Sequence, residues 1–133
     1  MLKSIILIFL VITVISGCSS ADLLTEISGK EWNVKSLLGK TLTGSEKPPT
    51  INFGDNGKIF GSTGCNNFVG NFKLSGSSLS LDPGALTKMF CPDSPETEFL
   101  SAIKQVTNIK MENGTLNLLN GTHSVITLIP GSK

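Results

Sequence analysis

The chain has 133 residues, and its 11 lysines, without any arginine, stand against 10 acidic residues for a formal net charge of +1. A length of this order accommodates one domain. A nearly neutral chain without arginine lacks both the basic surface that nucleic-acid binding requires and the side chain that grips phosphate in a bidentate manner. Because 39% of the residues are hydrophobic and 16% are charged, the composition also excludes an intrinsically disordered chain.

The amino terminus has the three-part organisation of an export signal. Lys3 provides a positive charge, and residues 5–15 are apolar except for one threonine. Eleven helical residues rise about 16 Å, roughly half of the hydrocarbon core of a membrane. Residues 1–17 are therefore predicted to be a signal peptide and not a membrane-spanning helix.

The end of this signal resembles the lipobox of bacterial lipoproteins. An aliphatic residue, Ile15, is followed by two small residues and then by Cys18. In a lipobox the cysteine thiol carries diacylglycerol, and the cysteine becomes the first residue of the mature protein. Two or three acyl chains such as palmitate, at about 0.8 kcal/mol per buried methylene, anchor a protein to a membrane without a transmembrane helix. The alternative is a plain secretory signal with an incidental cysteine.

The residue after Cys18 indicates in which membrane the protein is anchored. Ser19 stands where an inner-membrane retention signal typically has aspartate, so resemblance to enterobacterial sorting predicts the outer membrane, with the protein facing the periplasm. Residues 18–28 are predicted to be a lipidated N-terminal tether, with a short polar start at 19–22. The folded domain is predicted to span residues 29–131.

The remaining cysteines have four interpretations: a redox pair, metal ligands, a structural disulfide or free buried thiols. With Cys18 acylated, Cys65 and Cys91 form an even pair in an oxidising compartment. Their separation is far from the C-x-x-C spacing of a thiol oxidoreductase, and one histidine with two cysteines is too few ligands for zinc. We therefore predict a structural disulfide, which stabilises the fold by roughly 3 kcal/mol, with free buried thiols as the alternative. No metal or cofactor is predicted.

Most of the chain has the alternating pattern of β-strands. Trp32 and Val34 alternate with polar neighbours and predict a half-buried strand, whereas residues 39–49, rich in Gly, Thr, Ser and Pro, predict a loop. Four hairpins are predicted, with turns at residues 55–57, 75–77, 113–114 and 120–121. The last two turns also match the glycosylation sequon, but Asn-Gly as a tight turn is the preferred interpretation.

One segment departs from this pattern and predicts a helix of about 12 residues. Ser94 can cap it, Pro95 suits its first position, and two glutamates follow in the first turn. Its apolar stripe consists of Phe99, Leu100, Ile103 and Val106. The predicted fold class is α+β and mainly antiparallel β: seven or eight strands that close or nearly close into a small barrel, with this amphipathic helix packed on it. Closure is expected because the chain has few charges to protect sheet edges.

Two sequence blocks resemble the signature of the META domain family of HslJ-like envelope proteins. Residues 64–72, GCNNFVGNF, resemble the pattern G-C-N-x-F-x-G-x-[YF], and residues 87–92, TKMFCP, resemble T-[RK]-M-x-C-P. The resemblance covers residues 29–130. The sequence departs from the pattern at Phe90, where a small residue is usual, and at Phe72, where tyrosine is common.

The resemblance implies a small envelope or secreted protein, often a lipoprotein, with an antiparallel barrel-like fold. Members of the family are linked to heat-shock response, drug tolerance and virulence-related secretion, without an agreed biochemical activity. A likeness of this fold to lipid-binding secretin pilots implies a cavity, although a shared fold does not confer a function.

The motif residues have a structural and a functional interpretation. In the first, the Gly-Cys-Asn block fixes a bend and the disulfide, and the Asn66 side chain satisfies backbone groups at a turn. In the second, the motif lines a small pocket for a ligand or peptide, with Lys88 as its charged residue. The candidate pocket residues are Gly64, Asn66, Phe68, Gly70, Thr87, Lys88 and Met89.

Three classes of function follow from these observations. The preferred prediction is a non-enzymatic envelope lipoprotein that binds or stabilises a periplasmic protein or an outer-membrane assembly. The alternative is a lipid-binding or hydrolase-inhibitor lipoprotein of the periplasm. An enzyme is disfavoured, because His123 lies near a predicted turn, a helix start accounts for Asp93, Glu96 and Glu98, and neither His-Glu-x-x-His nor Gly-x-Ser-x-Gly occurs.

Overall fold

The computed structural model describes residues 20–44 and 47–132. The predicted signal peptide and Cys18 lie outside the described residues. In the described part of the chain, neither helix has the length and apolar character of a membrane span.

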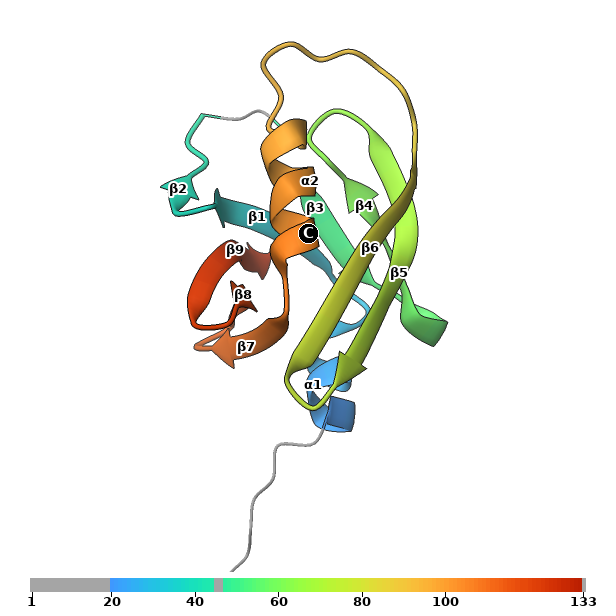
Figure 1. Ribbon diagram of the computed structural model, residues 1–133, viewed down its shortest axis with the longest axis vertical. Helices are drawn as coiled ribbons and strands as arrows, with labels where there is room; N and C mark the ends of the chain where they lie inside the picture. The colour runs from blue at the N-terminus through green and yellow to red at the C-terminus, as the bar shows by residue number, and fades with distance from the viewer. Residues whose placement is uncertain (1–19, 45–46, 133) are drawn as a thin grey trace, which may run out of the picture.

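The described residues form nine strands, two α-helices and one short 3₁₀ turn (Figure 1). In chain order these elements are α1 (Ser20–Ile27), β1 (Glu31–Leu37), β2 (Lys40–Thr41), β3 (Thr50–Phe53), η1 (Asp55–Gly57), β4 (Lys58–Ser62), β5 (Asn67–Ser75), β6 (Ser78–Leu86), α2 (Glu96–Gln105), β7 (Asn108–Glu112), β8 (Thr115–Asn120) and β9 (His123–Pro130). The additional strand, β2, has two residues and lies within the segment predicted to be entirely loop. The alternation of apolar and polar residues cannot predict this strand, because two residues are too few to show it.

The strands form one antiparallel sheet that returns on itself. Their order is β2-β1-β3-β4-β5-β6-β7-β8-β9, and β9 pairs with β1 to complete a ring, while β2 extends it beside β1. The seam between β6 and β7 is the weakest join, with the single register pair Ser78–Asn108. The predicted fold class, a mainly antiparallel sheet in a closed or nearly closed barrel, is confirmed.

All four predicted hairpins are present, and local turn chemistry explains them. Between β3 and β4, Asn56 and Gly57 both have positive φ, 56° and 71°. Between β7 and β8, Asn113 and Gly114 do the same, at 50° and 76°. Asparagine and glycine tolerate this left-handed conformation better than other residues, so the Asn-Gly pairs set the turns.

The helix α2 contacts β6 on one side and β9 and β1 on the other, and it contributes part of the barrel core. Phe99, Ala102 and Ile103 are buried on its inner face. The predicted start of this helix is wrong by one residue. Pro95 occupies the N-cap position, and no side chain caps the helix, so Ser94 does not have the predicted role. Proline is compatible with this position because it needs no N–H hydrogen bond there.

The helix α1 was not predicted from the sequence. Its last residue, Ile27, is fully buried in the core, and the Ile27 carbonyl accepts a hydrogen bond of 2.8 Å from Trp32 Nε1. An eight-residue helix is too short to be stable alone, so its formation depends on this packing. A sequence pattern cannot show that dependence.

Candidate functional site

The two motif blocks meet at one end of the barrel. Residues 63–66 connect β4 to β5, and the long segment from β6 to α2 arches over this connection (Figure 1). A disulfide between Cys65 and Cys91 joins the two segments, with their Cα atoms 5.8 Å apart. Blocks that are separate in the sequence therefore form one structural unit, called here the disulfide end.

Asn66 is the centre of this unit, and its side chain is 4% exposed. Its Oδ1 accepts hydrogen bonds from the Met89 amide at 2.6 Å and from Thr87 Oγ1 at 3.0 Å. Its Nδ2 donates to the Met89 carbonyl at 3.2 Å and to Glu96 Oε1 at 2.8 Å. The amide group thus uses its donor and acceptor capacity to fix the segment that follows β6 against the start of α2.

Thr63 and Glu96 complete the network. The Thr63 hydroxyl donates a hydrogen bond of 2.9 Å to Glu96 Oε1 and accepts one of 2.8 Å from the backbone N–H of Asn66. Glu96 occupies the first turn of α2, where the helix dipole favours a negative charge. In the described part of the chain, Thr63 and Asn66 are the buried polar residues, and both belong to this network. It therefore satisfies the polar groups that folding removes from water.

Phe68 and Phe72, the motif aromatics, lie in the core. Phe68 contacts Phe99 of α2 with ring centroids 5.8 Å apart, and Phe72 meets Phe53 edge-on at 5.2 Å. Both phenylalanines are buried, and their ring contacts connect β5 to α2 and β3.

Steric contacts explain why two positions of the first motif block are occupied by glycine. Gly64 has a φ of +91°, and a Cβ at this position would lie 2.9 Å from the ring of Pro95. Gly70 is buried in β5, and a Cβ there would lie 1.9 Å from the Asp82 carbonyl oxygen. Neither position accommodates a side chain without movement of its neighbours.

The comparisons with known proteins agree with this geometry. The model of the META domain matches residues 25–132. Heat shock protein HslJ of Escherichia coli (strain K12) is 32% identical over 95 residues, an alignment that covers 68% of this chain and 67% of that protein. The chain belongs to the META domain family. The prediction of this family from the two sequence blocks is confirmed.

Two structures solved by NMR share the fold of this META domain. One is 26% identical with a TM-score of 0.63, and the alignment covers 80% of this chain and 92% of that chain. The other, a protein from Burkholderia xenovorans, is 19% identical with a TM-score of 0.63, covering 86% and 89% of the two chains. At 19% identity the second likeness shows the fold alone.

The structure separates six of the seven candidate pocket residues of this META domain into two groups, and Gly64 belongs to neither. Asn66, Phe68 and Gly70 are buried, whereas Thr87, Lys88 and Met89 lie on the exposed segment that leaves β6. The hydrogen bonds of Asn66 connect the groups through the Met89 backbone and the Thr87 hydroxyl. Gly64 borders a hollow of about 400 Å³, which is open to solvent. The other residues that line this hollow are Lys47, Cys91, Pro92, Asp93, Ser94 and Pro95.

Sequence reasoning missed Thr63 and Glu96 as members of the network. A signal existed for Glu96, since a carboxylate in the first helical turn can accept hydrogen bonds from groups that face the helix start. No comparable signal marks Thr63, because its burial depends on the approach of α2.

The residues considered for acid–base chemistry lie apart. His123 begins β9 and is exposed, Glu98 is exposed on α2, and Glu96 is engaged by Thr63 and Asn66. The sequence Ser101–Lys104 has Ser-x-x-Lys spacing, but both side chains are exposed, and Ser101 Oγ contacts Gln105. In residues 20–44 and 47–132, no group of three or more His, Cys, Asp or Glu side chains is placed to hold a metal ion.

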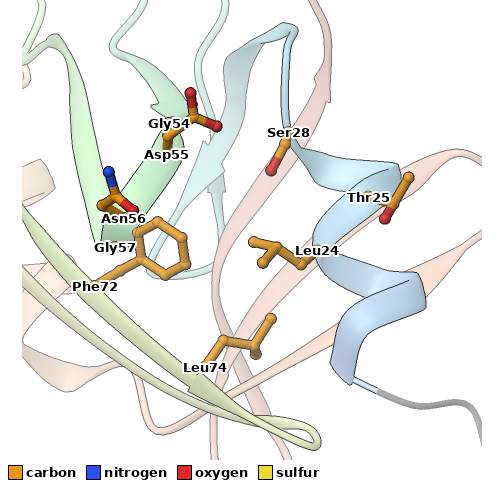
Figure 2. A pocket seen from close by; sticks show the side chains of 9 residues that line it. All are labelled: Leu24, Thr25, Ser28, Gly54, Asp55, Asn56, Gly57, Phe72 and Leu74. Atoms are coloured by element: carbon orange, nitrogen blue, oxygen red, sulfur yellow. The ribbon is translucent and has the colours of Figure 1, made fainter.

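A second hollow lies at the opposite end of the barrel, between α1 and the turn η1. It measures about 400 Å³, and Figure 2 shows Leu24 of α1 facing Phe72 and Leu74 of β5 across it. Asp55 and Asn56 form its polar border. We call this region the α1 end; its apolar side can receive a hydrocarbon group.

Proposed function

We propose that this META domain is a non-enzymatic, lipid-anchored protein of the bacterial cell envelope that binds or stabilises a periplasmic partner or outer-membrane assembly. The observation that carries the proposal is the Cys65–Cys91 disulfide, which leaves Cys18 as the third cysteine of the chain. Structural disulfides persist in oxidising compartments such as the periplasm. Cys18 in turn ends the lipobox-like sequence, so the cysteine inventory and the export signal indicate the same location.

The geometry of the disulfide end supports a binding role. Thr63, Asn66 and Glu96 use their polar groups on each other and on the backbone, which makes them structural. A rigid end that presents a fixed surface suits recognition of another molecule. The relative named heat shock protein HslJ supports a connection with stress, and Ser19 after the lipid-bearing cysteine supports the outer membrane.

The anchor is tested by blocking lipoprotein processing. Globomycin, an inhibitor of the lipoprotein signal peptidase, is expected to accumulate a form that retains residues 1–17, and labelled palmitate is expected to enter the wild type but not Cys18→Ala. A Cys65→Ala variant is the matched control, because it removes a cysteine without removing the proposed lipid acceptor. Unchanged processing and label in Cys18→Ala would contradict the anchor.

The role is tested by complementation. Deletion of the protein is expected to increase the sensitivity of stressed cells to detergents and drugs. The wild type should restore resistance, whereas a secreted Cys18→Ala form at equal abundance should not. Full complementation by the unanchored form would contradict a function that depends on the membrane anchor.

The second candidate function is lipid binding, and the α1 end favours it. Leu24, Phe72 and Leu74 form the apolar lining of a hollow whose volume lies in the lower range of small-molecule sites (Figure 2). Native mass spectrometry of the unanchored protein should then show a co-purifying acyl chain that a Leu74→Asp variant loses. The absence of bound lipid in the wild type would eliminate this candidate.

A further inference from the structure

We propose that Met89 and Phe90 form an apolar prong that inserts into a pocket of a partner protein. This inference deepens the proposed function and rests on it, since it uses the membrane anchor at Cys18 to orient the molecule. The prong is the part of the second motif block whose side chains have no role inside the fold. The hydrogen bonds of the Met89 segment use its backbone, and the crosslink uses Cys91.

The exposure of these two side chains is unusual for their chemistry. Phe90 is 91% exposed and Met89 is 60% exposed, and they are adjacent in the sequence. Burial of a phenylalanine or methionine side chain is worth about 1.5–3 kcal/mol, a gain that the isolated protein does not make here. A partner that covers both side chains would gain this free energy.

The prong is held in place before any partner arrives. On one side of Phe90, the Asn66 side chain bonds both the amide and the carbonyl of Met89. On the other side, Cys91 is crosslinked to Cys65, and its carbonyl accepts a hydrogen bond from Ser94. Fixed backbone on both sides reduces the conformational entropy lost on binding, which is how a preorganised anchor residue gains affinity.

The orientation of the molecule argues against insertion into the anchoring membrane. Figure 1 shows α1 and the segment after β6 at opposite ends of the longest axis. The proposed lipid-bearing residue, Cys18, stands two positions before Ser20, the first residue of α1. Two residues span at most about 7 Å, so the anchor holds the α1 end near the membrane and the prong away from it.

The same geometry argues against a second copy as the occupant. Two copies anchored in one leaflet present their prongs in the same direction, which prevents a prong from reaching the α1 end of its neighbour. A contact of prong against prong joins two convex surfaces of a few hundred Å², well below the roughly 800 Å² per partner of a stable interface. The prong therefore requires a concave partner of a different kind.

Lys88 defines the chemistry of that partner further. It precedes the prong, it is exposed, and it forms no ion pair with any described residue. A pocket with apolar walls and an acidic rim complements an apolar prong with a lysine at its base. The proposed partner is a periplasmic protein with such a pocket.

The test begins with photocrosslinking in cells that produce the full-length protein. The photoreactive residue p-benzoylphenylalanine replaces Phe90 in one variant and Phe60 in the control. Phe60 is also aromatic and 45% exposed, but it lies on β4, on the side of the barrel. We expect one prominent protein adduct from position 90 that position 60 does not give.

The protein in that adduct is then purified, and its affinity for the mature lipoprotein is measured in detergent. We expect Phe90→Ala to weaken binding at least about tenfold and Met89→Ala to weaken it several-fold. Lys88→Glu should slow association, in a manner that added salt reduces. Phe60→Ala should leave the affinity unchanged, and the melting temperature of Phe90→Ala should equal that of the wild type, because the side chain contacts little of the fold.

Four results of the crosslinking and affinity measurements would overturn the prong. They are a position-90 adduct with lipid, an adduct with a second copy, no specific adduct, and a partner whose affinity is the same for Phe90→Ala and the wild type. Binding of the unanchored wild type to vesicles of phosphatidylethanolamine and phosphatidylglycerol, lost in Phe90→Ala, would also overturn it. Failure of the proposed function is distinguishable, because the processing and complementation tests compare the wild type with Cys18→Ala, and both proteins retain Phe90.

Discussion

The disulfide end of the barrel is held by a covalent bond and a buried hydrogen-bond network, whereas the α1 end is held by the packing of Ile27 and its hydrogen bond with Trp32. Asn66 alone makes four side-chain hydrogen bonds at the disulfide end. The α1 end closes with a helix of eight residues. The two ends therefore differ in what fixes them, although one continuous sheet connects them.

Because of this difference, the disulfide end can expose side chains on a fixed backbone, whereas the α1 end covers the core. Directional bonds fix the backbone of Met89, which allows its side chain and that of Phe90 to face solvent without loss of order. Apolar packing fixes α1 less specifically, because it constrains burial more than position. The disulfide end thus suits recognition, and the α1 end suits a cover over the core.

Removal of the disulfide is expected to cause the largest loss of unfolding free energy among the changes that distinguish the two ends. The double variant Cys65→Ala/Cys91→Ala should lose about 3 kcal/mol of unfolding free energy, because closure of the loop restricts the unfolded chain. The Asn66 network should still hold the segment after β6, so the Met89 amide should remain protected from hydrogen exchange. Urea denaturation and NMR exchange measure the two quantities. Loss of protection at Met89 would show that the crosslink, and not Asn66, positions the prong.

Asn66→Ala should have the next largest effect. It removes four hydrogen bonds and leaves buried partners unsatisfied, so a loss of about 2–3 kcal/mol in unfolding free energy is expected. Asn67→Ala is the matched control, because this neighbouring side chain is exposed and should change stability by less than about 0.5 kcal/mol. Equal effects of the two substitutions would remove the reason for assigning Asn66 the central role.

Gly64→Ala tests the contact between the first motif block and the start of α2. The positive φ and the contact with Pro95 both oppose a side chain, so a loss of about 2 kcal/mol is expected. Gly76→Ala separates the two causes, since Gly76 also has positive φ, +59°, but nothing lies within 4 Å of its Cβ position. Thermal unfolding should rank Gly64→Ala as clearly the more damaging. The reverse order would mean that Pro95 moves aside easily.

The smallest effect is expected at the α1 end. Trp32→Phe removes the hydrogen bond to the Ile27 carbonyl but keeps an aromatic ring in the core, so a loss of about 1 kcal/mol is expected. Amide exchange within α1 should accelerate more than exchange at Met89. Lys30→Ala is the control, because it removes only the exposed contact of Lys30 with the Trp32 ring. Equal acceleration at both ends would show that the ends are not independent.

Much of the fold could be predicted because its signals are local. The turn at Asn113-Gly114 follows from the conformational tolerance of two residues, and the buried face of α2 follows from the spacing of Phe99 and Ile103. The structural interpretation of Asn66 also came from its place beside a turn. Each inference needed only a few neighbouring residues.

The errors concern features that exist only through distant contacts. The α1 helix depends on Trp32 for its C-terminal hydrogen bond, and Thr63 is buried because α2 covers it. The expected capping by Ser94 is replaced by Pro95, whose position is coupled to Gly64 across the disulfide end. None of these contacts has a periodic signature.

The sequence by itself determined the META family, the hairpins and the main helix, because these depend on residue type, spacing and short-range backbone preferences. Only the tertiary structure decided that the two motif blocks share one hydrogen-bond network and that Phe90 projects from it. The physical reason is that the burial of a side chain depends on which distant segments cover it. Phe68 and Phe90 have the same side chain, yet one is enclosed by the barrel and the other stands in solvent.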